Sequence, residues 1–87
     1  MANVTSVTEE QRESIPPYLR IAAALRERIL AGELQPGQML PSTTRIAQEE
    51  GVSTITAAKA LKVLHSEGLA YSVQGLGTFV AGDAQAD

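Results

Sequence analysis

Two serines in the stretch LPSTTRIAQEEGVSTITAAKAL, residues 40–61, stand immediately before runs of residues with helical spacing. Ser42 and Ser53 are therefore predicted to be helix N-caps, because a serine oxygen accepts a hydrogen bond from a backbone amide of the first turn. The other free amides of that turn favour anions. Arg45 stands where a capping box would place Glu or Gln, and a cation there is unfavourable unless a phosphate or an acidic partner lies nearby. The predicted chemistry is therefore anion binding.

The sequence gives no support for catalysis. It contains no cysteine, which removes thiolate zinc sites and cysteine nucleophiles. His65 is the only histidine, so we expect neither a metal cluster nor a nucleophile and base pair around it, and we interpret it as a surface or interface residue. The GLG of residues 75–77 lacks the strand, helix and third glycine of a dinucleotide-binding turn. We expect no enzyme, no catalytic residue, no metal and no cofactor.

The first predicted helix runs from Tyr18 to Ala31, after the Pro-Pro pair of residues 16 and 17. Its apolar residues recur at intervals of four, three and four, which is the spacing of one buried stripe; they are Tyr18, Ala22, Leu25 and Ile29. Gly32 is expected to end the helix in a left-handed conformation. A turn at residues 36–37 and a very short strand at residues 39–40 are predicted to follow.

A second and a third helix follow Ser42 and Ser53, with Gly51 at the sharp turn between them. The third helix is expected to reach about Glu67 and to bury one stripe, formed by Thr56 or Ala57, Ala60, Leu61 and Leu64. Two short β segments, residues 69–73 and 78–81, are joined by the QGLG of residues 74–77, which is typical of a hairpin. This order predicts an α+β fold, a winged helix-turn-helix with three helices and a small β-hairpin wing.

Composition and charge divide the 87 residues into three parts: a mobile arm at 1–15, a winged-helix domain at 16–82 and a mobile tail at 83–87. The net charge is -3, but the two ends together carry -4, so the body carries +1. Such a body attracts DNA weakly at long range and must depend on local geometry. Because no apolar run is long enough for a membrane span or a signal peptide, we expect a cytoplasmic protein.

Three stretches resemble the N-terminal DNA-binding domain of the GntR family of bacterial transcription regulators. They are LRERILAGELQPGQMLPS, IAQEEGVSTITAAKALKVLHSEGLA and QGLGTFV. The resemblance implies a homodimer on an inverted repeat of double-stranded DNA, with the third helix in the major groove and the wing tip near the minor groove or the backbone. Family members usually continue into a larger C-terminal domain that binds a metabolite. With 87 residues, we expect no small-molecule effector.

The chain departs from the family pattern at positions where the family usually carries arginine. Those positions hold Thr44, Thr54 and Ala58, and Ser72 and Val73 replace bases that are typical of the first wing strand. Each missing arginine removes a possible bidentate contact to phosphate or guanine, and a good bidentate base contact contributes about 1 to 3 kcal/mol of discrimination. The usual means of reading guanine are therefore reduced.

The predicted DNA contacts come from the two helix starts, the outer face of the third helix and the wing tip. Arg45 is expected to contact a phosphate, and Lys59 a phosphate or a guanine edge. Ile55 is expected to meet a thymine methyl group, to meet a protein, or to fold back against Val52. Because Thr, Ile and Ala side chains can touch thymine methyl groups, the set favours an A·T-rich site. The full set is Ser42, Thr43, Thr44, Arg45, Ser53, Thr54, Ile55, Thr56, Ala58, Lys59, Lys62, Gln74, Gly75 and Gly77.

Two functions remain open from the sequence. The first is a sequence-specific DNA-binding transcription regulator, a small dimeric repressor or activator. The second is a protein-interaction module, in which a winged helix with a neutralised DNA face binds another regulatory protein as an antirepressor or as a heterodimer subunit. The lost arginine positions and the acidic ends favour the second function, whereas the motif order favours the first.

Overall fold

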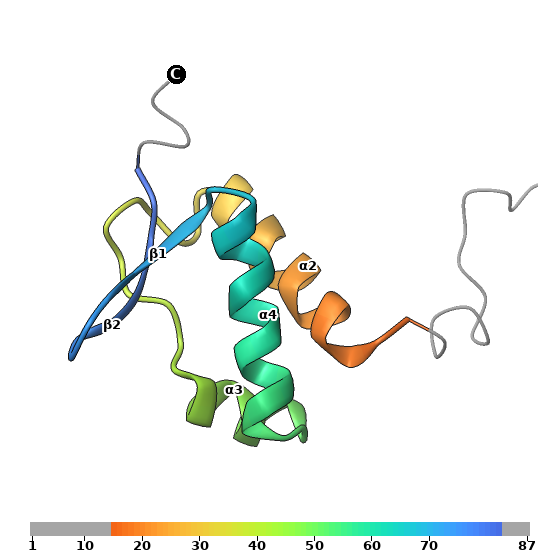
Figure 1. Ribbon diagram of the computed structural model, residues 1–87. Helices are drawn as coiled ribbons and strands as arrows, with labels where there is room; N and C mark the ends of the chain where they lie inside the picture. Colours follow the sequence, from red (N-terminus) through yellow and green to blue (C-terminus); the bar gives the residue numbers. More distant parts are fainter. Residues whose placement is uncertain (1–14, 83–87) are drawn as a thin grey trace, which may run out of the picture.

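The computed structural model describes residues 15–82. Helix α2 (Pro17–Leu30) is followed by α3 (Thr43–Glu50), α4 (Thr54–Ser66) and the strands β1 (Ala70–Val73) and β2 (Gly77–Val80) (Figure 1). The predicted three helices and hairpin wing are thus confirmed, with element ends within one or two residues of those expected. The mobile arm and the tail were predicted for residues that lie, except for Ile15, outside the described range. Within that range, no helix has the length and apolar character needed to cross a membrane.

The core is aliphatic and lies between α2, α3, α4 and the base of the wing. On α2 the predicted stripe is confirmed at Ala22, Leu25 and Ile29, which are buried together with Ile21. Tyr18 was predicted to belong to this stripe, but it is only partly buried and packs at the edge of the core. The ring of Tyr18 lies in the first turn of α2, next to the outer side of α4. The prediction was therefore wrong for that residue.

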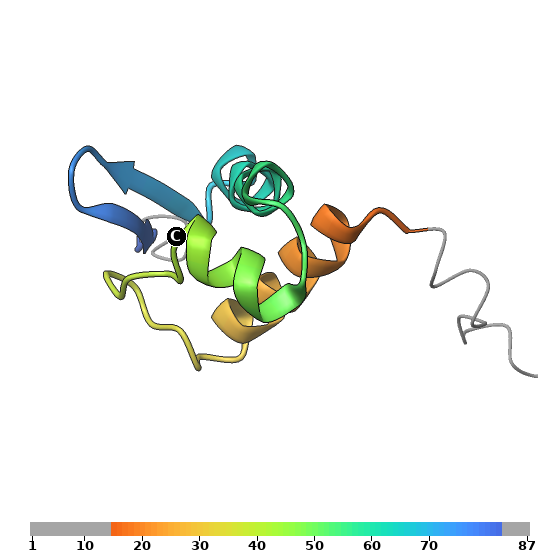
Figure 2. The ribbon, with the colours of Figure 1, turned by 90° about the horizontal axis from the view of Figure 1, so that it is seen from below.

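The predicted caps of α3 and α4 are confirmed. The Ser42 Oγ accepts a hydrogen bond from the Arg45 backbone amide at 3.1 Å, and the Ser53 Oγ accepts one from the Thr56 amide at 3.0 Å. Gly51 lies between the helices with φ +69°, in the left-handed region that favours glycine. This conformation reverses the chain within a few residues, so that α3 crosses beside the first turns of α4 (Figure 2).

On α4, the alternative between Thr56 and Ala57 is resolved in favour of Ala57. Its side chain is fully buried, and Ala60, Leu61 and Leu64 continue the buried stripe as predicted. Thr56 is half-buried and belongs to the cap, since its Oγ1 also lies 3.1 Å from the Ser53 Oγ. The small residues at positions 57 and 60 allow α4 to lie close to its neighbours, and this packing sets which face of α4 remains outside.

The wing is an antiparallel pair with Tyr71 opposite Phe79 and Ser72 opposite Thr78. Because side chains alternate along a strand, Tyr71 and Phe79 lie on one face, where their rings stack at a centroid distance of 5.7 Å. The short strand predicted at residues 39–40 is reduced to a single bridge between Met39 and Phe79. On the other face, the Ser72 Oγ lies 3.0 Å from the His65 Nε2 of α4, which joins the wing to the helix.

A bidentate ion pair ties the C-terminal end of α4 to α2. The Nε and Nη2 of Arg26 each donate to Glu67 at 2.8 Å, and this hydrogen bonding lowers the pKa of the Glu67 carboxyl below its ordinary value. A carboxyl with a lowered folded-state pKa stabilises the fold above its unfolded pKa, and this contribution is lost as the pH falls through the folded pKa.

We therefore expect Glu67→Gln to lower the free energy of unfolding at pH 7 by about 1 kcal/mol or less, because solvent screens a pair whose side chains are about one third exposed. The deficit relative to the parent protein should disappear as the pH falls through the lowered pKa of Glu67, because the carboxyl of the parent then becomes protonated. Urea unfolding from pH 7 to pH 2.5 measures it. Glu50→Gln is the matched control, since Glu50 makes no ion pair within residues 15–82. An equal deficit at both ends of this pH range would contradict the assignment.

Candidate nucleic-acid interface

The outer face of α4 carries small, apolar and basic side chains. Burial of residues 57, 60, 61 and 64 against the core leaves Ile55, Ala58, Lys59 and Lys62 exposed on the other side. The side chain of Ile55 is 72% exposed, so the alternative in which it folds back against Val52 is wrong. Ile55 and Ala58 thus place apolar side chains in water beside the two lysines.

The short turn at Gly51 joins the end of α3 to the start of α4, and α3 lies next to the first turns of α4 in both ribbon views (Figures 1 and 2). Ser42, Thr44, Ser53 and Thr54 are exposed there, whereas Thr43 is half-buried. No acidic residue lies in the first turn of either helix. The structure thus brings the predicted hydroxyl contacts to one side of the molecule, with free amides that favour anions.

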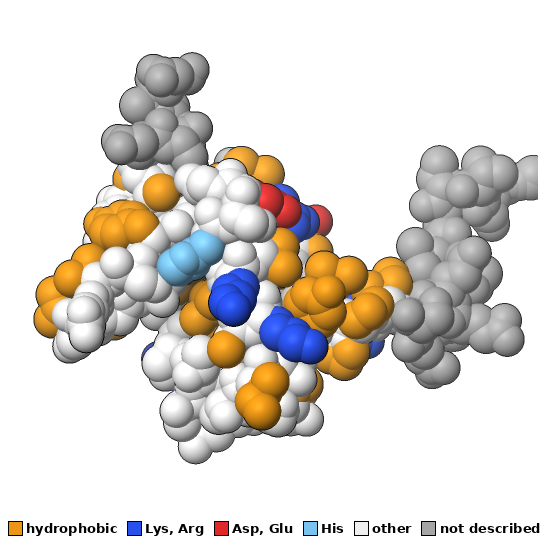
Figure 3. Space-filling model, in the orientation of Figure 1, with side chains coloured by type: hydrophobic (Ala, Val, Ile, Leu, Met, Phe, Trp, Pro, Cys, Tyr) orange, Lys and Arg blue, Asp and Glu red, His pale blue; other side chains and the backbone are white. Residues whose placement is uncertain are grey.

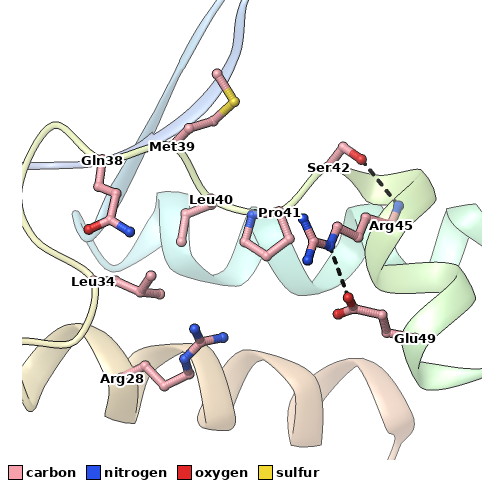
Figure 4. Close-up of a pocket in the computed structure, with 9 residues that line it drawn as sticks. All are labelled: Arg28, Leu34, Gln38, Met39, Leu40, Pro41, Ser42, Arg45 and Glu49. Carbon is pink, nitrogen blue, oxygen red and sulfur yellow. Dashed lines mark hydrogen bonds and ion pairs between the residues drawn. The ribbon is translucent and has the colours of Figure 1, made fainter.

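Arg45 has an intramolecular partner that the sequence did not predict. Its Nε donates to the Glu49 Oε2 at 2.9 Å, one turn further along α3, and this bond raises the pKa of the Arg45 guanidinium (Figure 4). Both side chains are more than half exposed and border an open groove of about 430 Å³ that Arg28 also lines. Glu49 therefore supplies, at least in part, the acidic partner that a cation near the start of α3 requires.

Most of the arginines in the described range are paired with carboxylates. Arg26 pairs with Glu67, and Arg28 pairs with Glu33 at 3.3 Å, in addition to the pair at Arg45. Lys59 and Lys62 form no such pair with any residue between 15 and 82. Figure 3 shows basic side chains over the outer face of α4, beside an apolar area at the start of α2. The available positive charge of this face therefore comes from α4.

Gln74, Gly75 and Gly77 lie at the tip of the wing, as predicted, and are exposed. Between the two glycines, the side chain of Leu76 is 66% exposed, and the prediction did not include it. The sequence signal for an exposed Leu76 was its position, since a residue between two glycines in a hairpin turn has nothing to pack against. The tip is carried well to one side of α4, so the two contact regions are separate (Figure 1).

The geometry adds no catalytic or metal arrangement to this surface. Across residues 15–82, no three His, Cys, Asp or Glu side chains are grouped as metal ligands. His65 contacts Ser72, and the Ser72 Oγ lies 3.4 Å from the Thr78 Oγ1. These polar contacts join the wing to α4 and form no nucleophile and base pair with an orienting third group. What the surface offers is hydrogen-bond donors, two lysines and apolar contacts.

Residues 17–80 match the family described as bacterial regulatory proteins, gntR family. The chain is 42% identical over 71 residues to the HTH-type transcriptional repressor NagR of Bacillus subtilis (strain 168), covering 82% of this chain and 29% of NagR. It is 43% identical over 65 residues to the mannosyl-D-glycerate transport/metabolism system repressor MngR of Escherichia coli (strain K12), covering 75% of this chain and 27% of MngR. This chain thus spans less than a third of the length of either repressor.

A solved structure is similar over the same region. The crystal structure of AraR(DBD) in complex with operator ORR3 superposes with a TM-score of 0.73 at 42% sequence identity, over 76% of this chain and 80% of the other. That structure contains a DNA-binding domain on an operator. Its similarity therefore concerns most of the described fold.

Proposed function

This chain belongs to the GntR family of bacterial regulatory proteins, and we propose that it binds double-stranded DNA in the bacterial cytoplasm and regulates transcription as a small dimeric repressor. The names of its relatives NagR and MngR, both repressors, support this sign of regulation. The similarity to a DNA-binding domain seen on its operator supports the mode of binding. The natural site for two copies is an inverted repeat, because its symmetry matches that of a dimer.

The observation that carries the proposal is the exposed face of α4, on which Ile55 and Ala58 stand in water beside two lysines without ion-pair partners in the described range. A helix in the major groove meets base edges at its centre and phosphates at its flanks. Apolar side chains at the centre suit thymine methyl groups. The proposed site is therefore rich in A·T, with Thr54, Ile55 and Ala58 toward the bases.

The other predicted contacts are assigned to the DNA backbone. Ser42, Thr43, Thr44, Ser53 and Thr56 lie at the two capped helix starts, where amides and hydroxyls suit phosphate oxygens. Gln74, Gly75 and Gly77 carry the wing tip toward the minor groove or the backbone. If the two lysines of each protomer neutralise one phosphate each, the logarithm of the binding constant of a dimer should fall with the logarithm of salt concentration with a slope of about -4.

The proposal is tested by incubating fragmented bacterial genomic DNA with the purified protein at physiological salt and sequencing what is retained. One enriched inverted repeat rich in A·T is the expected result. A circular dichroism spectrum and a cooperative unfolding transition establish beforehand that the protein is folded. Retention of fragments at background level by folded protein would contradict DNA binding.

Substitution of Glu49 should strengthen DNA binding. Glu49→Gln removes a negative charge from the α3 surface and releases the Arg45 guanidinium from its present partner. We expect affinity for a duplex to rise about two- to fivefold at low salt, with a salt slope steeper by up to about one per protomer. Fluorescence anisotropy at several salt concentrations measures both quantities. Glu50→Gln changes the net charge equally without releasing an arginine, and equal effects of the two substitutions would show that Arg45 does not reach DNA.

A specific feature of the wing favours protein binding as a second candidate function. Met39, Tyr71, Val73 and Leu76 are exposed apolar side chains, and exposed apolar groups in one region are typical of protein contacts. In that case the chain would act on another regulatory protein through its wing. Leu76→Ser together with Val73→Ser would then abolish biological activity while Lys59→Gln would leave it intact, which is the reverse of the pattern expected for a DNA regulator.

A further inference from the structure

A groove between the first turn of α2 and the outer flank of α4 differs in charge from the groove of Figure 4. It is a shallow, widely open hollow lined by Tyr18, Lys59, Lys62, Val63 and Ser66. Two of these five residues are lysines and none is acidic, whereas the groove in Figure 4 holds Glu49 beside its arginines. A groove with two cations and no carboxylate among its lining residues suits an anion.

Lys59 is held in this groove by an aromatic ring. Its Nζ lies 5.5 Å from the centre of the Tyr18 ring, within the distance at which a cation is attracted to the face of an aromatic group. The ring itself packs against the core, so its position is fixed by α2. The ammonium group of Lys59 is thereby attracted toward the side of α4 that faces the first turn of α2.

We propose that Tyr18 is a positioning residue that holds Lys59 for a phosphate of the DNA backbone, so that Lys59 does not read a base. This inference rests on the proposed function, and it decides between the two contacts that the sequence left open for Lys59. The phosphate lies in the groove with Lys62 as its second cation. The backbone on either side of a major groove faces the flanks of the inserted helix, and the α2 flank is where Tyr18 places the ammonium group.

The contact also explains how the fold uses an aromatic residue outside its core. A lysine loses much rotamer freedom when it is fixed on a ligand. The Tyr18 ring limits that freedom before DNA arrives, so less entropy remains to be lost on binding. Tyr18 therefore acts through Lys59 and needs no contact of its own with DNA.

The test is a double-mutant cycle on a mixed-sequence 20-base-pair duplex and on the repeat recovered by selection. Tyr18→Leu removes the ring but keeps an apolar group, Tyr18→Phe keeps the ring, and Lys59→Gln removes the cation. Lys62→Gln is the matched control, because that lysine lines the groove without contacting the ring. Dissociation constants and salt slopes are measured for each variant after its unfolding transition has been recorded.

We expect Tyr18→Leu to weaken binding to both duplexes about two- to fivefold, and Tyr18→Phe to bind as the parent does. In the Lys59→Gln background, Tyr18→Leu should have no further effect, whereas its effect should persist in the Lys62→Gln background. Lys59→Gln should reduce the salt slope by about one per protomer and weaken both duplexes alike.

Two results would overturn the inference while leaving the proposed function intact. One is an equal effect of Tyr18→Leu with and without the Lys59 cation. The other is a Lys59→Gln protein whose salt slope is unchanged and whose preference at one base pair is relaxed, which would make Lys59 a base reader. Failure of the parent protein to bind either duplex would instead contradict the proposed function itself, so the two failures are distinguishable. A Tyr18→Leu protein that unfolds is replaced by Tyr18→Met, which keeps the apolar volume closer to that of the ring.

Discussion

Replacement of Ala58 with glutamate is expected to weaken DNA binding by at least about 100-fold while the domain remains folded. Ala58 is exposed on the outer face of α4, so a longer side chain has room there, and glutamate is a good helix former. In a complex, the new carboxylate would be desolvated in the major groove between two phosphate backbones. Anisotropy titrations with the selected repeat measure the loss, and thermal unfolding establishes that the fold is retained.

Ala24→Glu provides the matched control for this experiment. Ala24 is also an exposed alanine within a helix, but it lies on α2, so the same change in charge occurs outside the proposed interface. We expect that variant to bind within about threefold of the parent, since the distant charge acts only through a screened potential. Comparable losses in both variants would mean that net charge, and not the α4 face, governs binding.

The largest expected effect on stability comes from Leu64→Ala. Leu64 is fully buried where α4 packs against α2, and truncation of such a leucine costs the transfer free energy of the lost methyl groups and leaves a cavity. The expected loss is about 2 to 5 kcal/mol in the free energy of unfolding. A domain of this size has a small margin, so the variant should be largely unfolded at 37 °C.

Urea unfolding followed by circular dichroism measures this loss, and Leu76→Ala is the control at the exposed wing tip. Removal of the same atoms from a side chain that is 66% exposed should change stability by less than about 0.5 kcal/mol. A Leu64→Ala protein as stable as the control would show that the packing of α4 on α2 contributes little to the fold.

The features that could be predicted from the sequence are those determined by local chemistry. The caps at Ser42 and Ser53 follow from one side-chain oxygen and a backbone amide three residues away, and Gly51 follows from a conformation that favours glycine. Within α4, the buried side was predictable because residues 57, 60, 61 and 64 repeat with the helical period. The outward position of Ile55, Ala58, Lys59 and Lys62 follows from the same period.

The features that could not be predicted depend on contacts between elements or on a choice among rotamers. The periodicity of α2 placed Tyr18 in the core, but whether the side chain at the end of a stripe is covered depends on the neighbouring helix, and Tyr18 is only partly buried. The contact between Tyr18 and Lys59 joins residues 41 positions apart and leaves no signal in spacing. Arg45 and Glu49 stand at the i, i+4 spacing of a helical ion pair, so their contact was open to prediction, but the expected phosphate competed with it.

Few basic side chains in the described part of this protein are free to contact DNA phosphates. Arg26, Arg28 and Arg45 are engaged with carboxylates, which leaves Arg20 of α2 and the two lysines of α4 as the basic side chains without an ion pair within residues 15–82. Recognition must therefore depend on the fit of α4 to base edges more than on bulk attraction. Such a protein should discriminate well among DNA sequences relative to its total affinity, since the non-specific part of binding is electrostatic.

The central claim is that the exposed face of α4 reads DNA sequence, and an equilibrium titration at physiological salt tests it most directly. The purified protein is titrated onto the selected inverted repeat and onto a duplex of the same base composition with the repeat scrambled. The account predicts two chains per repeat and an affinity at least about 1,000-fold higher than for the scrambled duplex, at the low end of the range for specific binding. Equal affinities for the two duplexes would contradict it.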